Sequence, residues 1–418
     1  MNQESDGPLS SCRVLDLTDE KGLFCGKMLA DLGADVIKIE PPGGDPCRNM
    51  GPFYHDIPEP EKSLYWLSFN TGKRGITLNI EVSDGREIFR QLVEKADIVI
   101  ESYDPGYLDS LGLGYSTLSQ INPGLILTSI SPFGETGPYK DFKASDIVVM
   151  ALSGYMSLSG DPDRPPVRVS SPIAYCFGAA GAAAGTMIAY YYRELTGEGQ
   201  WVDASAQQAV AFALLNSRMH WDLNRVELKR AGPYREGLSA RGKQLINFRC
   251  KDGYVNFVMF GGKTGAKTNR GLTQWMESEG MSSDFMNKID WDSFDMAKVS
   301  QDDFDRFERD IGQFFLTRTK AELYEEGSRR GVTIYPVSTI KDVFEDPQLK
   351  ARDFWQEVEH PELHATFLYP GPFVKCSQTP LRPPSRAPRI GEHNREIYQD
   401  ELGMSPEELV MLKQAKAI

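Results

Sequence analysis

Short apolar runs alternate with amphipathic stretches along the first half of the chain. The runs are rich in β-branched residues and predict strands at 12–17, 35–40, 75–80, 97–101 and 125–130. Helical patterns lie between them, at 24–32, 83–95 and 145–157. Strands that are apolar along their whole length and separated by helices indicate a parallel sheet buried on both faces. This half therefore predicts an α/β fold with a doubly wound, Rossmann-like layer.

The second half changes pattern several times. Two Ala-rich helices are expected at 176–195 and 205–224, then a hairpin at 244–258 with KDG as its turn, and a charged, helix-rich region to 330. Residues 345–391 are rich in proline, which predicts extended chain over a surface, and a helix follows at 405–415. These shifts predict four segments: a large domain at 1–224, a linker at 225–243, a small α+β domain at 244–330, and a return to the large domain at 331–418.

Composition and charge exclude several classes of protein. Hydrophobic residues make up 40% of the chain and charged residues 25%, as in ordinary globular domains. The net charge of −13 disfavours nucleic acid and anionic membranes as partners. The six cysteines form no CxxC pair and the N-terminus has no signal-peptide pattern, so we expect a cytoplasmic protein. The apolar stretch at 173–192 is interpreted as a buried core helix rather than a membrane span, because it is rich in Ala and Gly.

No common cofactor or metal motif is present in the sequence. The first strand is not followed by GxGxxG, and no GxxxxGK[ST] or HExxH occurs. His360 and His364 are four residues apart, but Pro361 between them argues against a helical metal pair. We therefore expect no metal site and no covalently bound cofactor.

The long polar loop at 159–175 leads directly into the Ala-rich helix. The start of such a helix is the positive end of its dipole, where a carboxylate is stabilised. This position would suit a catalytic acid, and Tyr175 stands there. On the residues alone, the chain is an α/β scaffold with long loops at its strand ends and no assigned reaction.

Dense, colinear matches along nearly the whole chain resemble the family III coenzyme A (CoA) transferases. They include VLDLTDEKGLFCGKMLADLGADVIKIEPPGGDPCR at 14–48, NTGKRGITLNI at 70–80, RELTGEGQWVDAS at 193–205 and GVTIYPVSTIKDVFEDPQLKARDFW at 331–355. The resemblance implies a Rossmann-like large domain built from both chain ends, a small domain between them, and two chains interlocked like rings. It also implies CoA and acyl-CoA as substrates.

The chemistry implied by the resemblance depends on one aspartate that is missing from this chain. In the family this residue attacks an acyl-CoA to form a mixed anhydride, then an enzyme thioester. It opens the Ala-rich helix in a context like PIAD, and the matching string in this sequence is Pro172-Ile173-Ala174-Tyr175. A phenol has an ordinary pKa near 10 against about 4 for aspartate, so Tyr175 would stay protonated at neutral pH. The racemase branch of the family carries a histidine where Ser145 stands. This chain therefore lacks both the histidine and the aspartate that racemase chemistry uses.

The loops that line the CoA site in the family have also changed. Asp19 and Glu20 lie in the first loop, and Asp104 replaces the arginine of an ENFRPG-like string, so negative charge would face the CoA phosphates. Lys143 matches a CoA-contacting lysine, although a solvated surface lysine is an equally good interpretation. The resemblance implies a partial or vestigial CoA site at Thr18, Pro41, Ser102, Tyr103 and Lys143.

These combined losses favour a subunit without its own covalent step. The resemblance implies that some members of the family form heterodimers, in which one chain carries the aspartate and its paralogue lacks it. This chain is most similar to the aspartate-lacking subunit of a transferase whose substrate is benzylsuccinate. We expect a homologous catalytic partner, in an interlocked heterodimer or a dimer of heterodimers. Gly261 and Gly262 match a loop that covers the partner's site. Two alternatives stay open: a CoA-dependent isomerase or lyase that uses Tyr175, and a CoA-binding regulatory protein without turnover.

Overall fold

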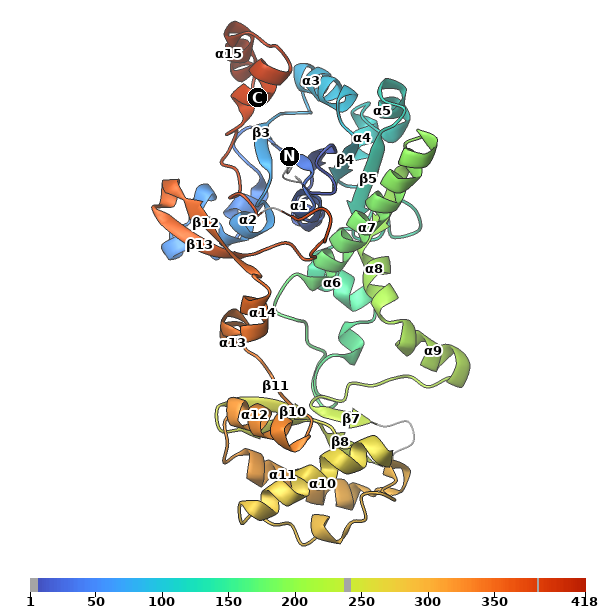
Figure 1. Cartoon of the computed structure of the whole chain (residues 1–418). Helices are drawn as coiled ribbons and strands as arrows, with labels where there is room; N and C mark the ends of the chain where they lie inside the picture. Colours follow the sequence, from blue (N-terminus) through green and yellow to red (C-terminus); the bar gives the residue numbers. More distant parts are fainter. Residues whose placement is uncertain (1–6, 237–241, 382) are drawn as a thin grey trace. The chain divides into compact units, whose positions relative to one another are not determined.

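The strands of the first half form one parallel sheet in a computed structural model that describes residues 7–236, 242–381 and 383–418 (Figure 1). The chain divides into two compact units. The large unit contains the described residues up to 156, together with 168–226 and 348–418, and the small unit contains 157–167 and 227–347. The small unit thus runs beyond residue 330, where the sequence placed the end of the small domain, and includes a short segment from the first half.

The sheet of the large unit has six parallel strands in the order β3-β2-β1-β4-β5-β6. The strands are β1 Arg13–Leu17, β2 Asp35–Glu40, β3 Arg74–Thr77, β4 Ile98–Glu101, β5 Ile126–Ser131 and β6 Trp201–Ser205. β4 and β5 are buried along their whole length, as expected for a sheet covered on both faces. The prediction of an α/β fold with a parallel sheet is confirmed. The strand order reverses between β1 and β4, where ligands usually bind in sheets of this kind.

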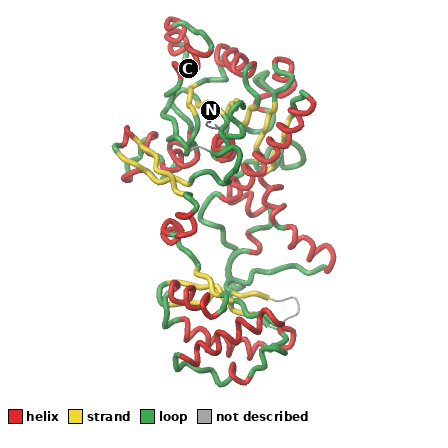
Figure 2. The backbone as a smooth tube through the Cα atoms, viewed as in Figure 1, coloured by secondary structure: helices red, strands yellow, loops and turns green. Residues whose placement is uncertain are grey.

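Helices cover both faces of this sheet (Figure 2). Leu15 and Leu17 point to one face and pack in a core with α3, whereas Val14 points to the other face and packs with α1 and α7. The helices of this part are α1 Leu23–Asp31, α2 Leu64–Phe69, α3 Ser83–Glu94, α4 Tyr107–Ser110, α5 Tyr115–Ile121, α6 Asp146–Leu152, α7 Ile173–Thr196, α8 Ala206–Ala213 and α9 Leu215–Asn224. The single helix expected at 205–224 is therefore two helices, separated at Leu214.

Helix α7 is the apolar stretch that raised the question of a membrane span. By length and composition it could cross a membrane, and 44% of its most apolar window is buried in this chain. It packs on α1, β5, β6 and α8. A Cβ added to Gly178 would lie 2.8 Å from the Cβ of Ala206, so the contact between α7 and α8 requires a residue without a side chain there. The helix starts at Ile173, three residues earlier than expected, which places Tyr175 in its first turn.

The end of the chain returns to the large unit and packs beside β3. Asn394 exchanges hydrogen bonds with Thr77, and the Tyr398 hydroxyl donates to Thr77 O at 2.6 Å. The elements are α14 Pro347–Ala351, β12 Trp355–His360, β13 Ala365–Pro370, a π-helix at Glu396–Glu401 and α15 Pro406–Gln414. The expectation of extended chain over a surface at 345–391 is wrong at 347–351, which form α14, and the extended residues of β12 and β13 pair as an antiparallel hairpin. Pro361 and Pro370 lie in its turn and at its end, where they remove no ladder hydrogen bond.

The small unit has its own core of aromatic and aliphatic side chains. Its elements are β7 Tyr234–Glu236, β8 Lys243–Leu245, β9 Asn247–Cys250, β10 Gly253–Phe257, α10 Gly262–Ser278, α11 Gln301–Phe315, α12 Lys320–Arg330, β11 Ile334–Pro336 and α13 Ile340–Glu345. β9 and β10 form the predicted hairpin. The segment expected to be a linker, 225–243, instead contributes β7, which pairs with β8; residues 237–241 lie outside the described residues.

Candidate functional site

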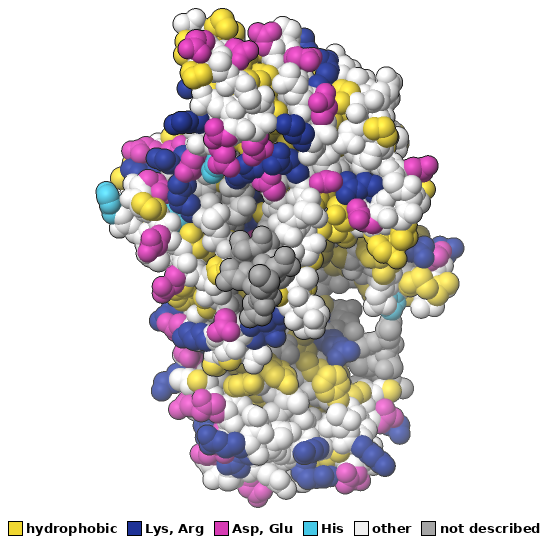
Figure 3. Space-filling model, turned by 45° about the horizontal axis from the view of Figure 1, so that its top comes forward, with side chains coloured by type: hydrophobic (Ala, Val, Ile, Leu, Met, Phe, Trp, Pro, Cys, Tyr) yellow, Lys and Arg dark blue, Asp and Glu magenta, His cyan; other side chains and the backbone are white. Residues whose placement is uncertain are grey.

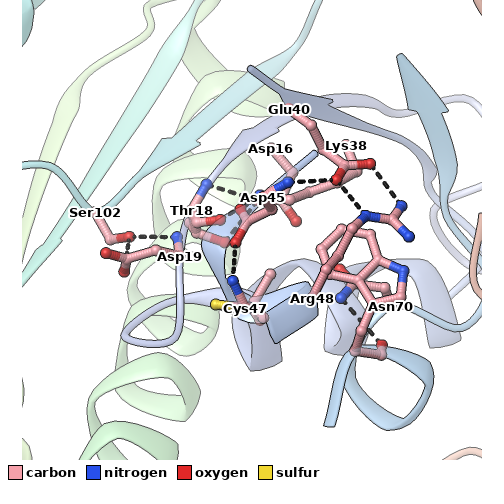
Figure 4. Close-up of polar contacts among 12 residues, drawn as sticks. Asp16, Thr18, Asp19, Lys38, Glu40, Asp45, Cys47, Arg48, Asn70 and Ser102 are labelled. Carbon is pink, nitrogen blue, oxygen red and sulfur yellow. Dashed lines mark hydrogen bonds and ion pairs between the residues drawn. The ribbon is translucent and has the colours of Figure 1, made fainter. Parts of the chain in front are cut away.

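Two loops meet at the point where the strand order reverses. Thr18 and Asp19 follow β1, and Ser102 follows β4. The Asp19 backbone N–H donates to Ser102 Oγ at 2.8 Å, and the Ser102 hydroxyl donates to Asp19 Oδ1 at 2.7 Å (Figure 4). Lys21 also forms an ion pair with Asp19. Asp19 therefore links the loop after β1 to the loop after β4.

A buried group of charged side chains holds the loop after β1 in place. Asp16 Oδ2 lies 2.8 Å from Lys73 Nζ, and Asp16 Oδ1 lies 3.7 Å from Lys38 Nζ and accepts from the Thr18 backbone N–H at 2.9 Å. Lys38 also donates to Thr18 O and lies 3.3 Å from Asp45 Oδ2 (Figure 4). Burial alone would raise the pKa of Asp16, but Lys73 and Lys38 together outweigh it and lower that pKa. All of these charges are compensated, so the group acts as scaffold.

The segment after β2 is held by a second buried ion pair. Arg48 binds Glu40 through two nitrogens, with Nε–Oε2 at 2.6 Å and Nη2–Oε1 at 2.8 Å. The Arg48 guanidinium also lies 3.8 Å from the ring centroid of Trp66, a cation–π contact. Pro41 is exposed, and its carbonyl accepts from the Gly44 N–H at 2.9 Å. Pro41 therefore belongs to a rigid turn at the same sheet edge as Thr18.

Tyr175, which the resemblance matches to the family aspartate, is a buried packing residue. It is 3% exposed, and its hydroxyl donates to Ala144 O at 3.0 Å. Its ring belongs to an apolar cluster with Val149, Met150, Ala174, Ala206 and Val210. Burial, followed by the charges of Glu20, Asp19 and Asp146, raises the pKa of Tyr175 further above its ordinary value. The phenol is therefore neutral, and its proton is engaged with a backbone carbonyl.

Asp146 lies beside Tyr175 and was missed by sequence reasoning. Its Oδ1 accepts from the Tyr175 backbone N–H at 2.9 Å, which caps the start of α7 with a carboxylate. Its Oδ2 is buried and has no hydrogen-bond partner within the described part of the chain. Asp146 is 29 residues from Tyr175 in the sequence. Only the contact between α6 and α7 brings them together, and no local pattern signals it.

Glu20 adds another carboxylate to the same place. Burial, Asp19 and Asp146 all act to raise the pKa of Glu20, and Lys21 opposes them without reversing the rise. The thiol of Cys176 follows the same trend, since burial and Asp146 raise its pKa to about 11. The start of α7 thus gathers Asp19, Glu20 and Asp146 around a neutral phenol and a neutral thiol. Such a site repels anions.

Lys143 is neutralised at the position where the resemblance placed a CoA contact. Its ammonium group forms an ion pair with Asp104, and the two side chains are 82% and 70% exposed. The nearby Tyr103 packs on Tyr107 with ring centroids 4.7 Å apart and donates its backbone N–H to Glu101 Oε2 at 2.7 Å. Asp104, which the resemblance matches to a family arginine, therefore neutralises the charge of Lys143.

Gly261 and Gly262 lie in the small unit, where the chain that leaves β10 enters α10. Gly261 immediately precedes α10, and a Cβ there would lie 3.0 Å from Phe294 O. Gly262 has a φ of +70° and nothing within 4 Å of an added Cβ. This turn needs glycine for its backbone at 262 and for space at 261.

The described residues offer no metal cluster, and the face drawn in Figure 3 is not continuously basic. Among residues 7–236, 242–381 and 383–418, no group of three or more His, Cys, Asp or Glu side chains is arranged to hold a metal ion. On the face shown in Figure 3, basic and acidic side chains are interspersed. That distribution does not resemble the continuous basic surface that nucleic acid requires.

Comparison with known proteins agrees with the family resemblance. The profile of CoA-transferase family III matches residues 9–394. The BbsE subunit of succinyl-CoA:(R)-benzylsuccinate CoA-transferase from Thauera aromatica is 39% identical over 93% of each chain. The formyl-CoA:oxalate CoA-transferase of Streptomyces avermitilis is 32% identical over 97% of this chain and 98% of its own. A crystal structure of a CAIB/BAIF family protein from Brucella suis matches with a TM-score of 0.79 and 29% identity, covering 94% of this chain and 99% of its own.

Proposed function

This chain belongs to CoA-transferase family III, and we propose that it is the aspartate-lacking subunit of a heteromeric CoA-transferase. The complex would move CoA between succinyl-CoA and an aryl-substituted dicarboxylic acid such as benzylsuccinate, in the cytoplasm. The substrate is taken from the relative of Thauera aromatica, whose name assigns it to a succinyl-CoA:(R)-benzylsuccinate CoA-transferase as a subunit. In this proposal the covalent step belongs to the partner chain.

The state of Tyr175 carries the proposal. The transferase step needs a carboxylate that attacks the acyl carbonyl and later leaves as part of an anhydride. Tyr175 offers a protonated phenol whose hydroxyl donates to Ala144 O and whose ring fills an apolar cluster. Its raised pKa also disfavours a role as a general base at neutral pH. These contacts do not favour the alternative in which Tyr175 performs an isomerase or lyase reaction.

The charges around the vestigial site support the same assignment. CoA carries phosphate groups, and like charges about 4 Å apart repel by about 1 kcal/mol in water and about 4 kcal/mol near a protein surface. Asp19 and Glu20 lie in the first loop, and Asp104 binds the one lysine expected to meet a phosphate. We therefore expect the chain to bind CoA weakly, if at all, even though Thr18, Ser102 and Tyr103 keep the family positions.

The partner is expected to be a homologous subunit that carries the aspartate. The two chains would form an interlocked heterodimer or a dimer of heterodimers. The turn at Gly261–Gly262 would then cover the partner's active site, where two adjacent glycines let the backbone approach a reacting group closely. This chain would shape that site without forming a covalent intermediate.

Native mass spectrometry of the untagged protein, purified undissociated from its own host, tests the proposal. The expected result is a complex with a second, non-identical chain of similar mass. The partner's sequence should carry an aspartate at the start of the helix that matches α7. A homodimer of this chain alone would overturn the proposal and would make Tyr175 the first residue to test for an activity of its own.

Calorimetric titration of the isolated full-length chain with free CoA tests the expectation that this chain binds CoA weakly. We expect no saturable binding up to about 1 mM, which corresponds to a binding free energy weaker than about −4 kcal/mol. The double variant Asp19→Asn/Asp104→Asn removes two of the negative charges that would repel the CoA phosphates. Its titration with CoA is the matched comparison for the unmodified chain. Micromolar binding of CoA by the unmodified chain would contradict this part and favour a CoA-binding regulatory protein.

A further inference from the structure

The large unit contains a cavity that shares only Asp104, paired with Lys143, with the residues that the proposed function uses. It has a volume of about 240 Å³ and lies on the sheet face opposite α7, over β4 and β5 and the start of β6. The short helices α4 and α5 and the loop after β5 complete its walls. Its lining combines carboxyl groups with aromatic rings. This combination differs from the apolar cores on either side of the sheet.

Three aromatic side chains line the cavity: Tyr107, Tyr115 and Trp201. Trp201 is 44% exposed, so the cavity is open to a ligand at that side. The indole N–H of Trp201 donates to Ser129 Oγ at 3.0 Å, which fixes the ring against β5. Aromatic faces attract ammonium and guanidinium groups by about 0.5–2 kcal/mol each.

The inner end of the cavity is formed by Glu101, which is 5% exposed. Its Oε2 accepts from the Tyr103 backbone N–H, and Ser129 also donates to the carboxyl group. Within the described residues, no lysine or arginine forms an ion pair with Glu101, although Lys21 acts on it from a greater distance. Burial raises the pKa of Glu101 to about 7, and the charge of Glu135 acts in the same direction.

Glu135 contributes a second carboxyl group from the loop after β5. Burial, followed by the charges of Asp203 and Asp109, raises the pKa of Glu135 to about 7. A hydrogen bond from the Gly106 backbone and the charge of Lys140 oppose this rise without reversing it. Near neutral pH the two carboxyl groups therefore hold roughly one proton between them, in a cavity whose described lining includes no lysine or arginine.

We propose that this cavity binds a small organic cation, an ammonium or guanidinium group on a short apolar chain. A buried carboxyl without an ion pair is stabilised either by a proton or by an external cation. The two carboxyl groups would bind the charged head, and the aromatic rings would pack against the chain. A metal ion is disfavoured, because the described residues offer no cluster of metal ligands. The proposal does not depend on the proposed transferase function.

The cation can come from two sources that share this chemistry. One source is a free amine or guanidine in solution. The other is a lysine or arginine side chain of another protein chain in the assembly. Either cation would favour the ionised form of Glu101 and Glu135, so that binding near pH 7 should release protons.

Titration calorimetry with n-butylguanidinium tests the proposal, with n-butanol as the uncharged probe of equal length. It is performed on the protein in the assembly in which it purifies and on the separated full-length chain. We expect saturable binding of the cation and none of the alcohol at pH 8. Affinity should fall at least tenfold at pH 5.5, where both carboxyl groups are protonated. Binding by the assembly identifies a free ligand, and binding by the separated chain alone identifies a side chain of the partner.

Two variants keep the test specific to the carboxyl groups. Glu101→Gln and Glu135→Gln should each weaken cation binding at pH 8 at least tenfold and reduce the proton release. Asp141→Asn, an exposed change in the same loop and outside the cavity lining, should leave both unchanged. Absence of cation binding in both preparations, equal binding of the alcohol, or unchanged binding in both glutamine variants would overturn the proposal.

Discussion

Two groups of charged side chains in the large unit differ in how their charges are balanced. Below the first loop, Asp16 lies between Lys38 and Lys73, and all three side chains are completely buried. At the start of α7, Asp19, Glu20 and Asp146 surround Tyr175, and Lys21 only partly offsets their charge at Glu20. The first group lowers the pKa of Asp16, and the second raises the pKa of Glu20.

The difference separates a scaffold from a site that, in the proposed function, has no anionic ligand to bind. A buried carboxylate costs several kcal/mol unless it is paired, so the first group is kept balanced by the fold itself. The second group keeps an excess of negative charge, which is tolerated because no anionic substrate has to bind there in the proposed function. Substitutions in the two groups should therefore have different consequences.

The largest effect is expected in the balanced group. Lys73→Met leaves Asp16 buried beside a single lysine and should lower the free energy of unfolding by about 3–5 kcal/mol. Chemical denaturation followed by circular dichroism measures it. Lys143→Met is the matched control, because the exposed pair of Lys143 with Asp104 should be worth no more than about 1 kcal/mol. Equal losses in the two variants would show that burial does not distinguish the pairs.

The next effect is expected when the missing acid is restored. Tyr175→Asp removes a buried ring and adds a fourth carboxyl group beside Asp19, Glu20 and Asp146, so it should destabilise by about 2–5 kcal/mol. It should not restore CoA transfer, since the loops that face CoA keep their negative charge. Transfer from succinyl-CoA is followed by chromatography of the CoA esters. Turnover by the homomeric variant would show that the aspartate is the only part missing.

A smaller effect is expected from Tyr175→Phe. This change keeps the ring in its apolar cluster and removes only the hydrogen bond to Ala144 O, which should cost about 1 kcal/mol. The activity of the assembled transferase should be unchanged. A large loss of turnover with normal stability would instead assign a chemical role to the phenol and contradict its place as a packing residue.

The smallest effect concerns pH and has opposite signs in the two groups. Because the pKa of Glu20 is raised from 4.5 in the folded protein, its contribution to stability is present below that value and lost as the pH rises through the folded pKa. Asp16, with a lowered pKa, stabilises above its ordinary value and loses this contribution as the pH falls. Glu20→Gln should therefore raise the melting temperature at pH 8 by about 1–2 °C and leave it nearly unchanged at pH 4. A lower melting temperature at pH 8 would contradict this sign.

The sequence predicted the sheet better than the hairpin near the other end of the chain. Apolar runs such as 35–40 identify a strand buried on both faces, and β2 has those bounds. The alternation in WQEVEH and ATFLYP at β12 and β13 was hidden by the surrounding prolines. A two-stranded hairpin with few apolar residues gives a weak periodic signal.

The candidate site was predictable only in part. The sequence resemblance pointed to Tyr175, and its burial follows from its place at the start of a core helix. The pairing of Asp16 with Lys38 depends on the register of β1 and β2, and the approach of Asp146 to Tyr175 depends on how α6 packs on α7. Both are tertiary contacts between residues far apart in sequence, which a single sequence does not specify.

The central claim is that no covalent step occurs on this chain. Intact-mass spectrometry of the purified assembly, denatured after brief incubation with succinyl-CoA and trapping with borohydride or hydroxylamine, tests it directly. We expect that only the partner chain changes in mass, and that a variant of its aspartate to alanine abolishes the change. A CoA or acyl adduct on this chain would contradict the claim.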